Sequence, residues 1–167
     1  MKAVWWIAAQ VRSNSELSVS SALRGKGYET FVPTYARVRD WSDRKKVTEA
    51  ALIAGYVFVQ VPLEKAHGPV VTTPGVIKIV EFGGKVAQLD EGEIERVRRV
   101  AHSSLRPEPW SYIKQNSQVK IARGALAGIR GTVLKVQENM ILIVSIEMLQ
   151  RSIAVHIDRS WVEPARD

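Results

Sequence analysis

The sequence predicts an α+β fold in two parts, an N-terminal antiparallel sheet flanked by helices and a small C-terminal β-barrel. Three observations support this prediction. The first 103 residues alternate between strand-like and helix-like patterns, a segment with two closely spaced prolines follows, and helical periodicity is then lost. Short β-rich runs recur after that point between turn residues, which is typical of a small closed barrel.

The chain opens with a predicted strand and a predicted helix. Residues 3–10 are rich in tryptophan and β-branched residues, which favour strands. Ser13 is followed three residues later by Glu16, a spacing that predicts a capping box at the start of a helix. The apolar stripe of this helix stops at Gly25, so we expect the helix to end there.

A protruding hairpin is expected next. Residues 28–33 and 35–39 have an extended pattern, and residues 47–52 continue it after a charged tip at positions 40–46. The tip contains more cations than carboxylates, so it is a candidate surface for an acidic partner.

Residues 54–61 predict the central strand of the sheet. Because strand side chains alternate between faces, the valines at positions 57, 59 and 61 share one face. Tyr56, Phe58 and Gln60 share the other face. Aromatic side chains on a solvent face are unusual, so this face is either covered by the same chain or left for a partner.

The segment after the central strand predicts turns and a second two-faced strand. Residues 68–75 are rich in glycine and proline, and in residues 76–82 the alternation puts Ile77 with Ile79 and leaves Phe82 on the opposite face. Gly83 and Gly84 predict a hairpin turn, because they lack the glycine spacing and the hydroxyl residue of a phosphate-binding loop.

A second helix is expected after Asp90. Asp90 and Glu93 have the spacing of a capping box. Apolar residues then recur at intervals of three and four: Ile94, Val97 and Ala101. The opposite side is charged, so the pattern predicts a helix that backs the sheet.

The second half of the chain predicts a separate β domain. Residues 104–114 are expected to form a linker between an N-terminal domain over residues 1–103 and a barrel over residues 115–167. We expect barrel strands at residues 119–122, 130–137, 140–146, 152–157 and 161–162. Residues 140–149 alternate with the period of a strand, which favours a barrel over a helical hairpin. Gly128 and Gly131 are expected to permit a sharp turn or bulge in a barrel strand.

Composition limits the function classes. A formal charge of +7 and a pI near 9.9 favour nucleic acid or another acidic surface as a partner, and a solvated basic surface is the plain alternative. The absence of cysteine excludes disulfides and thiolate metal sites. His67, His102 and His156 stand far apart, so we expect no enzyme, no metal and no cofactor. No signal peptide or membrane span is recognisable, and we expect a cytoplasmic monomer.

Several motifs resemble the NusG family. In the first part they are Trp5-Trp6, the tip from Trp41 to Lys46, the segment 52–59 and Thr73-Pro74-Gly75-Val76. In the second part, residues 124–133 are similar to the KOW motif. The tip Trp-Ser-Asp-Arg-Lys-Lys resembles the specialised paralogues that act as operon-specific antiterminators. The resemblance implies an N-terminal NusG (NGN) domain and an SH3-like KOW barrel.

This resemblance implies a transcription elongation and antitermination factor. The N-terminal domain would bind the coiled-coil clamp helices of bacterial RNA polymerase and suppress pausing or termination. The KOW barrel would recruit termination factor Rho or a small-subunit ribosomal protein. Two alternatives stay open: a KOW-containing RNA-binding protein associated with the ribosome, and a housekeeping family member that supports Rho-dependent termination.

The resemblance also implies a binding pocket for the clamp helices. Its residues carry over to apolar positions of the sheet and of the second helix: Ile53, Tyr56, Phe58, Phe82, Ile94 and Val97. Rigid aromatic side chains suit such a pocket because they bury a large area at a low entropic cost. Without the resemblance, an ordinary core is the favoured interpretation of these residues.

A second candidate interface is basic. It comprises the cations and the tryptophan of the hairpin, together with a cation after the first strand at a place where the family often has a DNA-facing residue: Arg37, Arg39, Trp41, Arg44, Lys45, Lys46 and Arg12. Cations pair with phosphates and a tryptophan stacks on unpaired bases, which suits the non-template DNA strand or the upstream duplex. A solvated loop is the alternative interpretation.

Overall fold

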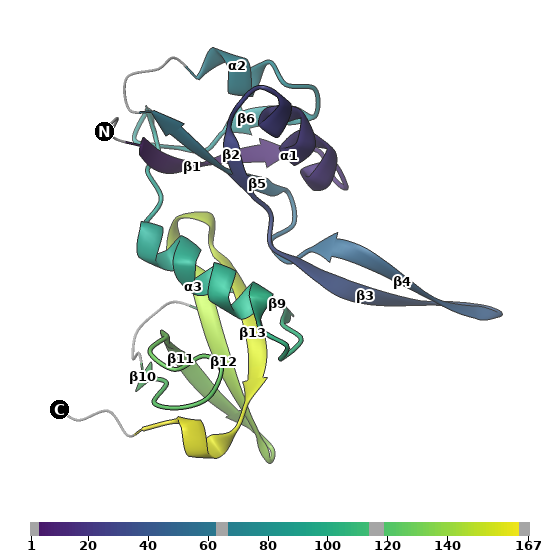
Figure 1. The fold of residues 1–167 in the computed structure, drawn as a ribbon, viewed down its shortest axis with the longest axis vertical. Coiled ribbons are helices and arrows are strands. Elements are labelled where there is room, and N and C mark those ends of the chain that lie inside the picture. Colours follow the sequence, from purple (N-terminus) through teal and green to yellow (C-terminus); the bar gives the residue numbers. More distant parts are fainter. Residues whose placement is uncertain (1–3, 63–66, 114–118, 164–167) are drawn as a thin grey trace. The chain divides into compact units, whose positions relative to one another are not determined.

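The computed structural model describes residues 4–62, 67–113 and 119–163 (Figure 1). Contacts within the chain divide it into two compact units, one made of residues 1–32 and 53–91 and the other of residues 33–52 and 92–167. The boundary that we expected at residues 104–114 rests on composition, whereas this division rests on contacts.

The first unit is an antiparallel sheet with one long and one short helix. In chain order its elements are β1 (Val4–Val11), α1 (Glu16–Gly25), β2 (Glu29–Phe31), β5 (Tyr56–Pro62), α2 (Gly68–Val71), β6 (Val76–Ile79), β7 (Glu81–Phe82) and β8 (Lys85–Val86). Four strands form the main sheet in the order β2-β5-β1-β6, and β7 pairs with β8. The predicted first strand, first helix and central strand are confirmed.

The core of this unit lies between α1 and one face of the sheet. β1 pairs with β5 from Val4 opposite Pro62 to Gln10 opposite Tyr56. This register puts three valines of β5 on the same face as Ile7, where Val19 and Leu23 of α1 cover them. The prediction that the valine face of the central strand is core is therefore correct.

The capping box predicted for α1 is wrong. The N-cap residue is Ser15, and its side chain makes no capping hydrogen bond. Glu16 does not reach back to the helix start, because its buried carboxylate Oε1 accepts a hydrogen bond from the backbone N–H of Gly55 at 2.9 Å. The Glu16 carboxylate therefore accepts from Gly55, which is distant in the chain, and not from a backbone N–H at the start of its own helix.

The segment 68–82 differs from its prediction in two ways. α2 is a short helix where we expected only turns, and it begins with Pro69 in its first turn, a position where proline is favoured. The predicted strand 76–82 is divided into β6 and β7, and the pairing of β1 with β6 shifts register between Gln10 and Val11. Ile79 is consequently buried while Ile77 is 54% exposed. The predicted hairpin turn at Gly83 and Gly84 is confirmed, with both φ angles positive.

The second unit contains a two-stranded ribbon, a helix and a five-stranded sheet. Its elements are β3 (Thr34–Trp41), β4 (Arg44–Ala51), α3 (Glu91–His102, all but its first residue), β9 (Glu108–Trp110), β10 (Val119–Lys120), β11 (Arg130–Val136), β12 (Asn139–Ile146), β13 (Arg151–Ile157) and the 3₁₀ turns η1 (Glu147–Leu149) and η2 (Arg159–Trp161). The sheet is antiparallel in the order β10-β11-β12-β13-β9. The second helix and the β character of residues 140–146 are confirmed.

Both faces of β12 are buried, because the segment 108–113 runs across one of them. Ile141 and Ile143 pack there with Trp110 and Ile113. Two buried hydroxyls, those of Ser145 and Ser152, lie 2.6 Å apart, and each also bonds the backbone of Ile113 at 3.1 Å. A strand, β9, therefore lies inside the predicted linker. The sequence did not predict this strand because it contains Pro109. Proline is nevertheless tolerated here, since β9 is at the edge of the sheet.

At the β10 end of the sheet, one isolated bridge and a few hydrogen bonds connect the neighbouring segments. Trp161 and Val162, where we expected a strand, form a 3₁₀ turn and one isolated bridge from Val162 to Ile121. Arg99 of α3 donates hydrogen bonds to the carbonyl oxygens of Ala127 at 2.9 Å and of Ala125 at 3.4 Å, which connects the helix to the loop before β11. Gly128 in this loop has φ +88°, as predicted.

No helix within the described residues is long and apolar enough to cross a membrane.

Gly131 is required for close packing rather than for an unusual backbone angle. A Cβ atom at this position would lie 2.6 Å from the carbonyl oxygen of Ile143 and 2.7 Å from Cδ1 of Leu142. We expect Gly131→Ala to lower the free energy of unfolding by about 1–3 kcal/mol, the usual cost of overpacking a core. Urea denaturation measures this, with Gly25→Ala as the control, because nothing lies within 4 Å of a Cβ at Gly25. Equal midpoints for the two variants would contradict the prediction.

Candidate functional site

The β3–β4 hairpin is a ribbon with two chemically different faces. Its strands pair from Thr34 opposite Ala51 to Trp41 opposite Arg44, so only Ser42 and Asp43 form the loop. Figure 1 shows this long ribbon, which forms a sheet of its own. Because alternate pairs in an antiparallel ribbon project to opposite sides, the register decides which charges lie together.

One face of the ribbon collects cations. Successive pairs on this side are Arg37 with Thr48, Arg39 with Lys46, and Trp41 with Arg44. We call the four cations of this side, Arg37, Arg39, Arg44 and Lys46, the basic face. All four are exposed. Like charges directly opposite each other are destabilising, so the pair of Arg39 and Lys46 is a place where an anion is favoured.

The opposite face is nearly neutral. Lys45 is paired with Asp40, and Ala36 with Glu49. Between them, Val38 and Val47 face each other with 59% and 64% of their surface exposed. The structure therefore brings together four of the predicted nucleic-acid-binding cations and separates Lys45 from them. Arg12 is exposed as well, but it belongs to the first unit, where its backbone N–H donates to Gly75 at 2.9 Å.

The six residues predicted to form a pocket for polymerase differ in exposure. Four are in the first unit and two are on α3: Ile53, Tyr56, Phe58 and Phe82, then Ile94 and Val97. Ile53, Phe58, Ile94 and Val97 are buried, Tyr56 is half-buried, and Phe82 is 73% exposed. The exposed aromatic surface of this set therefore belongs to Tyr56 and Phe82.

Phe58 is held within the sheet. It is opposite Phe31 in the pairing of β2 with β5, and the two rings stack with centroids 6.0 Å apart. Its exposed fraction is 0%. Of the two possibilities that the sequence left open for the aromatic face, coverage by the same chain therefore holds at this position.

A cavity beside α2 was not expected from the sequence. It has a volume of about 500 Å³, and its lining includes His67, Val71, Ile77 and Lys78. Val71 and Ile77 are exposed apolar residues, and Nδ1 of His67 is buried without a hydrogen-bond partner in the described part of the chain. The turn-rich composition of residues 68–75 gave no signal for a helix, so the cavity that α2 borders was not predictable.

The pKa of Asp158 is lowered, because its carboxylate accepts hydrogen bonds from the hydroxyl of Ser160 at 2.7 Å and from the backbone N–H of Ser160 at 2.9 Å. This carboxylate caps η2 and lies outside the candidate interfaces. Within residues 4–62, 67–113 and 119–163 there is no group of three His, Cys, Asp or Glu residues that could hold a metal ion.

The fold places the chain among α+β proteins that carry a small antiparallel sheet at the C-terminal end. The sequence model of the family described as "Transcription termination factor nusG" matches residues 5–98, more than half of the chain. The chain therefore belongs to the NusG family of transcription factors, which are not enzymes. The family and the absence of enzymatic function are as predicted.

Relatives resemble the chain over most of its length. A transcription termination/antitermination protein NusG of Helicobacter pylori is 27% identical over 170 residues, which cover 95% of this chain and 97% of that protein. The NusG of Pseudomonas aeruginosa is 30% identical over 81% of this chain and 78% of its own. A solved structure of Thermotoga maritima NusG covers 96% of this chain and 97% of its own with a TM-score of 0.57 at 20% identity, which supports the two-part fold.

Two phenylalanines of the predicted pocket should respond differently to truncation. Phe58→Ala removes a fully buried ring, so we expect it to lower the free energy of unfolding by about 3–5 kcal/mol. Phe82→Ala removes an exposed ring and should change stability by less than about 0.5 kcal/mol. Thermal or urea denaturation followed by circular dichroism compares the two. A stable Phe58→Ala variant would show that this ring is not part of the core.

Proposed function

We propose that the chain is an antitermination factor that binds the clamp helices of bacterial RNA polymerase through an N-terminal domain over residues 1–103. The observation that carries the proposal is the strongly exposed ring of Phe82 in a chain of the NusG family. An aromatic side chain that is 73% exposed on a short hairpin is accessible to a partner, and aromatic residues are enriched among the hot spots of protein interfaces. Such a factor acts as a monomer in the cytoplasm, where the polymerase works.

Buried and exposed residues of the pocket have separate tasks in this proposal. Tyr56 and Phe82 contact the partner helices, because they retain accessible aromatic surface. Phe58, stacked on Phe31, supports the strand that carries Tyr56. Ile53, Ile94 and Val97 are buried, so they offer little surface to the partner helices.

The basic face of the hairpin binds DNA next to the polymerase. Its four exposed cations lie on one side of a ribbon that has no other strand beside it among the described residues. A single-sided row of cations suits the phosphates of the non-template strand or the upstream duplex. In this proposal Trp41, the last residue of β3, stacks on an unpaired base, and the exposed Arg12 supplies a further cation.

The barrel over residues 115–167 recruits a second factor, either Rho or a small-subunit ribosomal protein. The specialised role rests on the Trp-Ser-Asp-Arg-Lys-Lys tip, whereas the relatives bear a name that covers both termination and antitermination. A transcription assay on a template with a Rho-dependent terminator separates the two roles. Readthrough supports antitermination, and increased Rho-dependent release supports a housekeeping role.

Capture of RNA polymerase tests the proposed interface. Phe82→Ala and Tyr56→Ala should each weaken capture at least about tenfold, the loss typical of an aromatic hot spot. Leu17→Ala on α1 is the control, because Leu17 is also exposed and apolar but lies outside the predicted pocket. Retention is measured with purified core polymerase and tagged protein. If ribosomal subunits are retained and polymerase is not, the chain is a ribosome-associated protein instead.

Binding to single-stranded DNA tests the basic face. Arg39→Ala combined with Lys46→Ala should reduce the magnitude of the slope of log affinity against log salt concentration by about 1.4. Each phosphate of a single strand that a cation neutralises contributes about 0.7 to this magnitude. Lys45→Ala changes the same tip but alters the opposite face, so it should leave the slope unchanged. Fluorescence anisotropy over a salt series measures both slopes. An equally large reduction for Lys45→Ala would show that the tip binds without a preferred face.

A further inference from the structure

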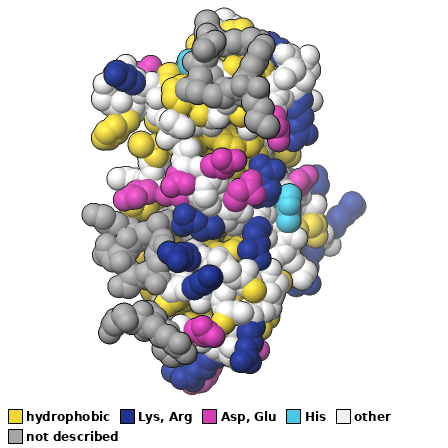
Figure 2. Space-filling view, turned by 60° about the vertical axis from the view of Figure 1, so that its left-hand side comes forward, with side chains coloured by type: hydrophobic (Ala, Val, Ile, Leu, Met, Phe, Trp, Pro, Cys, Tyr) yellow, Lys and Arg dark blue, Asp and Glu magenta, His cyan; other side chains and the backbone are white. Residues whose placement is uncertain are grey.

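Glu16 carries a carboxylate in an unusual place. Figure 2 shows acidic side chains exposed to solvent on the face drawn, which is the usual place for such groups. Glu16, the first residue of α1, is instead only 7% exposed. Burial of a carboxylate is costly unless the group accepts hydrogen bonds, so the partner of Glu16 indicates its role.

That partner is the backbone of Gly55. Oε1 of Glu16 accepts a hydrogen bond from the N–H of Gly55 at 2.9 Å, across 39 residues of sequence. Gly55 has φ +87°, a left-handed conformation, in the turn that leads into β5. Its carbonyl oxygen accepts from the N–H of Val11 at 2.8 Å. Both backbone polar groups of Gly55 therefore have partners, one on α1 and the other on β1.

One of these two bonds depends on a side chain. The bond to Val11 joins backbone atoms, whereas the bond to Glu16 is lost when the carboxylate is removed or withdrawn. Hydrogen bonds to an ionised acceptor are also stronger than those between neutral groups. Glu16 therefore holds the peptide group on the N-terminal side of Gly55.

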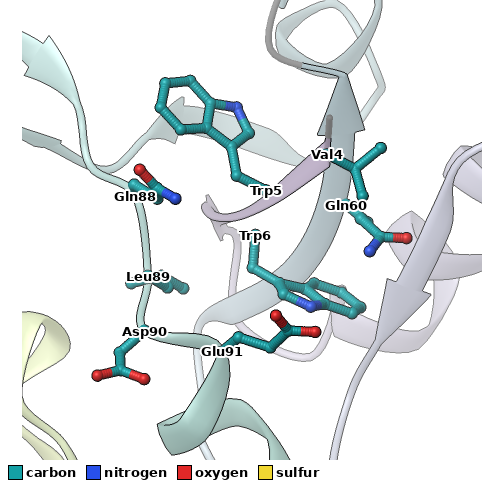
Figure 3. Close-up of a pocket in the computed structure, with 8 residues that line it drawn as sticks. All are labelled: Val4, Trp5, Trp6, Gln60, Gln88, Leu89, Asp90 and Glu91. Carbon is teal, nitrogen blue, oxygen red and sulfur yellow. The ribbon is translucent and has the colours of Figure 1, made fainter. Parts of the chain in front are cut away.

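The residue after Gly55 is Tyr56, the first residue of β5. Tyr56 pairs with Gln10 in the register of β1 with β5 and is half-buried. At the opposite end of the same strand pair, Trp6 and Gln60 line a cavity of about 320 Å³ (Figure 3). The pair thus borders a cavity at one end and is tied to α1 by a hydrogen bond at the other end, where Tyr56 lies.

We propose that Glu16 is a positioning residue for the contact that Tyr56 makes with polymerase. By holding Gly55, its carboxylate sets the direction in which the tyrosine ring leaves the sheet before a partner is bound. This inference rests on the proposed function, in which Tyr56 contacts the clamp helices. A contact residue that is ordered in advance lowers the entropic cost of association, so loss of the bond weakens binding although no contact atom is removed.

Stabilisation of the helix is the simpler role for Glu16. An acidic side chain in the first turn stabilises the positive end of the helix dipole through its charge. Positioning instead requires an acceptor atom at the reach of a glutamate. Glu16→Gln keeps the reach and loses the charge, whereas Glu16→Asp keeps the charge and loses the reach. The two roles therefore predict opposite rankings of these two variants.

Amide hydrogen exchange of Gly55, measured by NMR on the full chain, tests the bond in the absence of polymerase. Glu16→Asp should accelerate exchange at Gly55 by about tenfold or more, because hydrogen bonds to charged groups give this degree of protection. Glu16→Gln should accelerate it less. The amide of Val19, which is bonded to Ser15 within α1, is the internal reference and should not change in Glu16→Asp. Unchanged exchange at Gly55 in Glu16→Asp would overturn the proposal.

Capture of purified core polymerase tests the functional consequence. Glu16→Asp should weaken capture by about three- to tenfold, the cost of ordering a released turn and its side chain on binding, and Glu16→Gln should weaken it less. Glu29→Ala is the matched control and should leave capture unchanged, because it removes an exposed carboxylate from β2 in the same unit. If Glu16→Gln loses more capture than Glu16→Asp, the charge at the helix start explains Glu16 and the proposal is wrong.

Double variants determine whether Glu16 acts through Tyr56. Glu16→Asp combined with Tyr56→Ala should weaken capture no further than Tyr56→Ala alone, whereas in combination with Phe82→Ala the two losses should multiply. Multiplication in both backgrounds would contradict the proposal, because a general loss of folded structure affects both contacts. If Tyr56→Ala itself leaves capture intact, the proposed function fails at this residue. The exchange of Gly55 then still decides whether Glu16 holds the turn.

Discussion

The pairing of β1 with β5 is the constraint on which the N-terminal unit depends. Its antiparallel register sends three valines of β5 toward α1 and turns Phe58 and Gln60 to the other side. A shift by one residue would exchange these faces and expose the core. The same register places Trp6 opposite Gln60 and Gln10 opposite Tyr56, so the position of Tyr56 follows from the hydrogen bonds of one strand pair.

A hydrogen bond between residues far apart in sequence holds this arrangement at one end. Gly55, the residue before β5, donates its N–H to the carboxylate of Glu16, and its carbonyl oxygen accepts from Val11 at 2.8 Å. The start of α1, the end of β1 and the start of β5 therefore meet at a single residue. The capping-box pattern placed the N-cap at Ser13, whereas it is Ser15, and local spacing cannot reveal that the Glu16 carboxylate has a competing donor 39 residues away.

The hairpin shows how strand register separates charges that are mixed along the sequence. Its tip contains both carboxylates and cations, and the counts alone do not distinguish a solvated loop from a binding surface. The register moves Asp40 and Lys45 to one side and leaves four cations on the other. A charge pattern that is mixed along the chain thus becomes a single-sided basic surface, which suits contacts to phosphates.

The sequence by itself determined the elements with strong periodicity: β1, α1, β5, α3, the hairpin, and the strand character of residues 140–146. The sequence also indicated the NusG family, because the motifs of both parts are short contiguous stretches of residues. Tertiary structure alone decided three things. Phe58 is covered by Phe31, β9 pairs despite Pro109 because it is an edge strand, and Leu89 joins β1 through one bridge. In each case the deciding partner is distant in the chain, and periodicity reports which face a residue occupies but not what lies against that face.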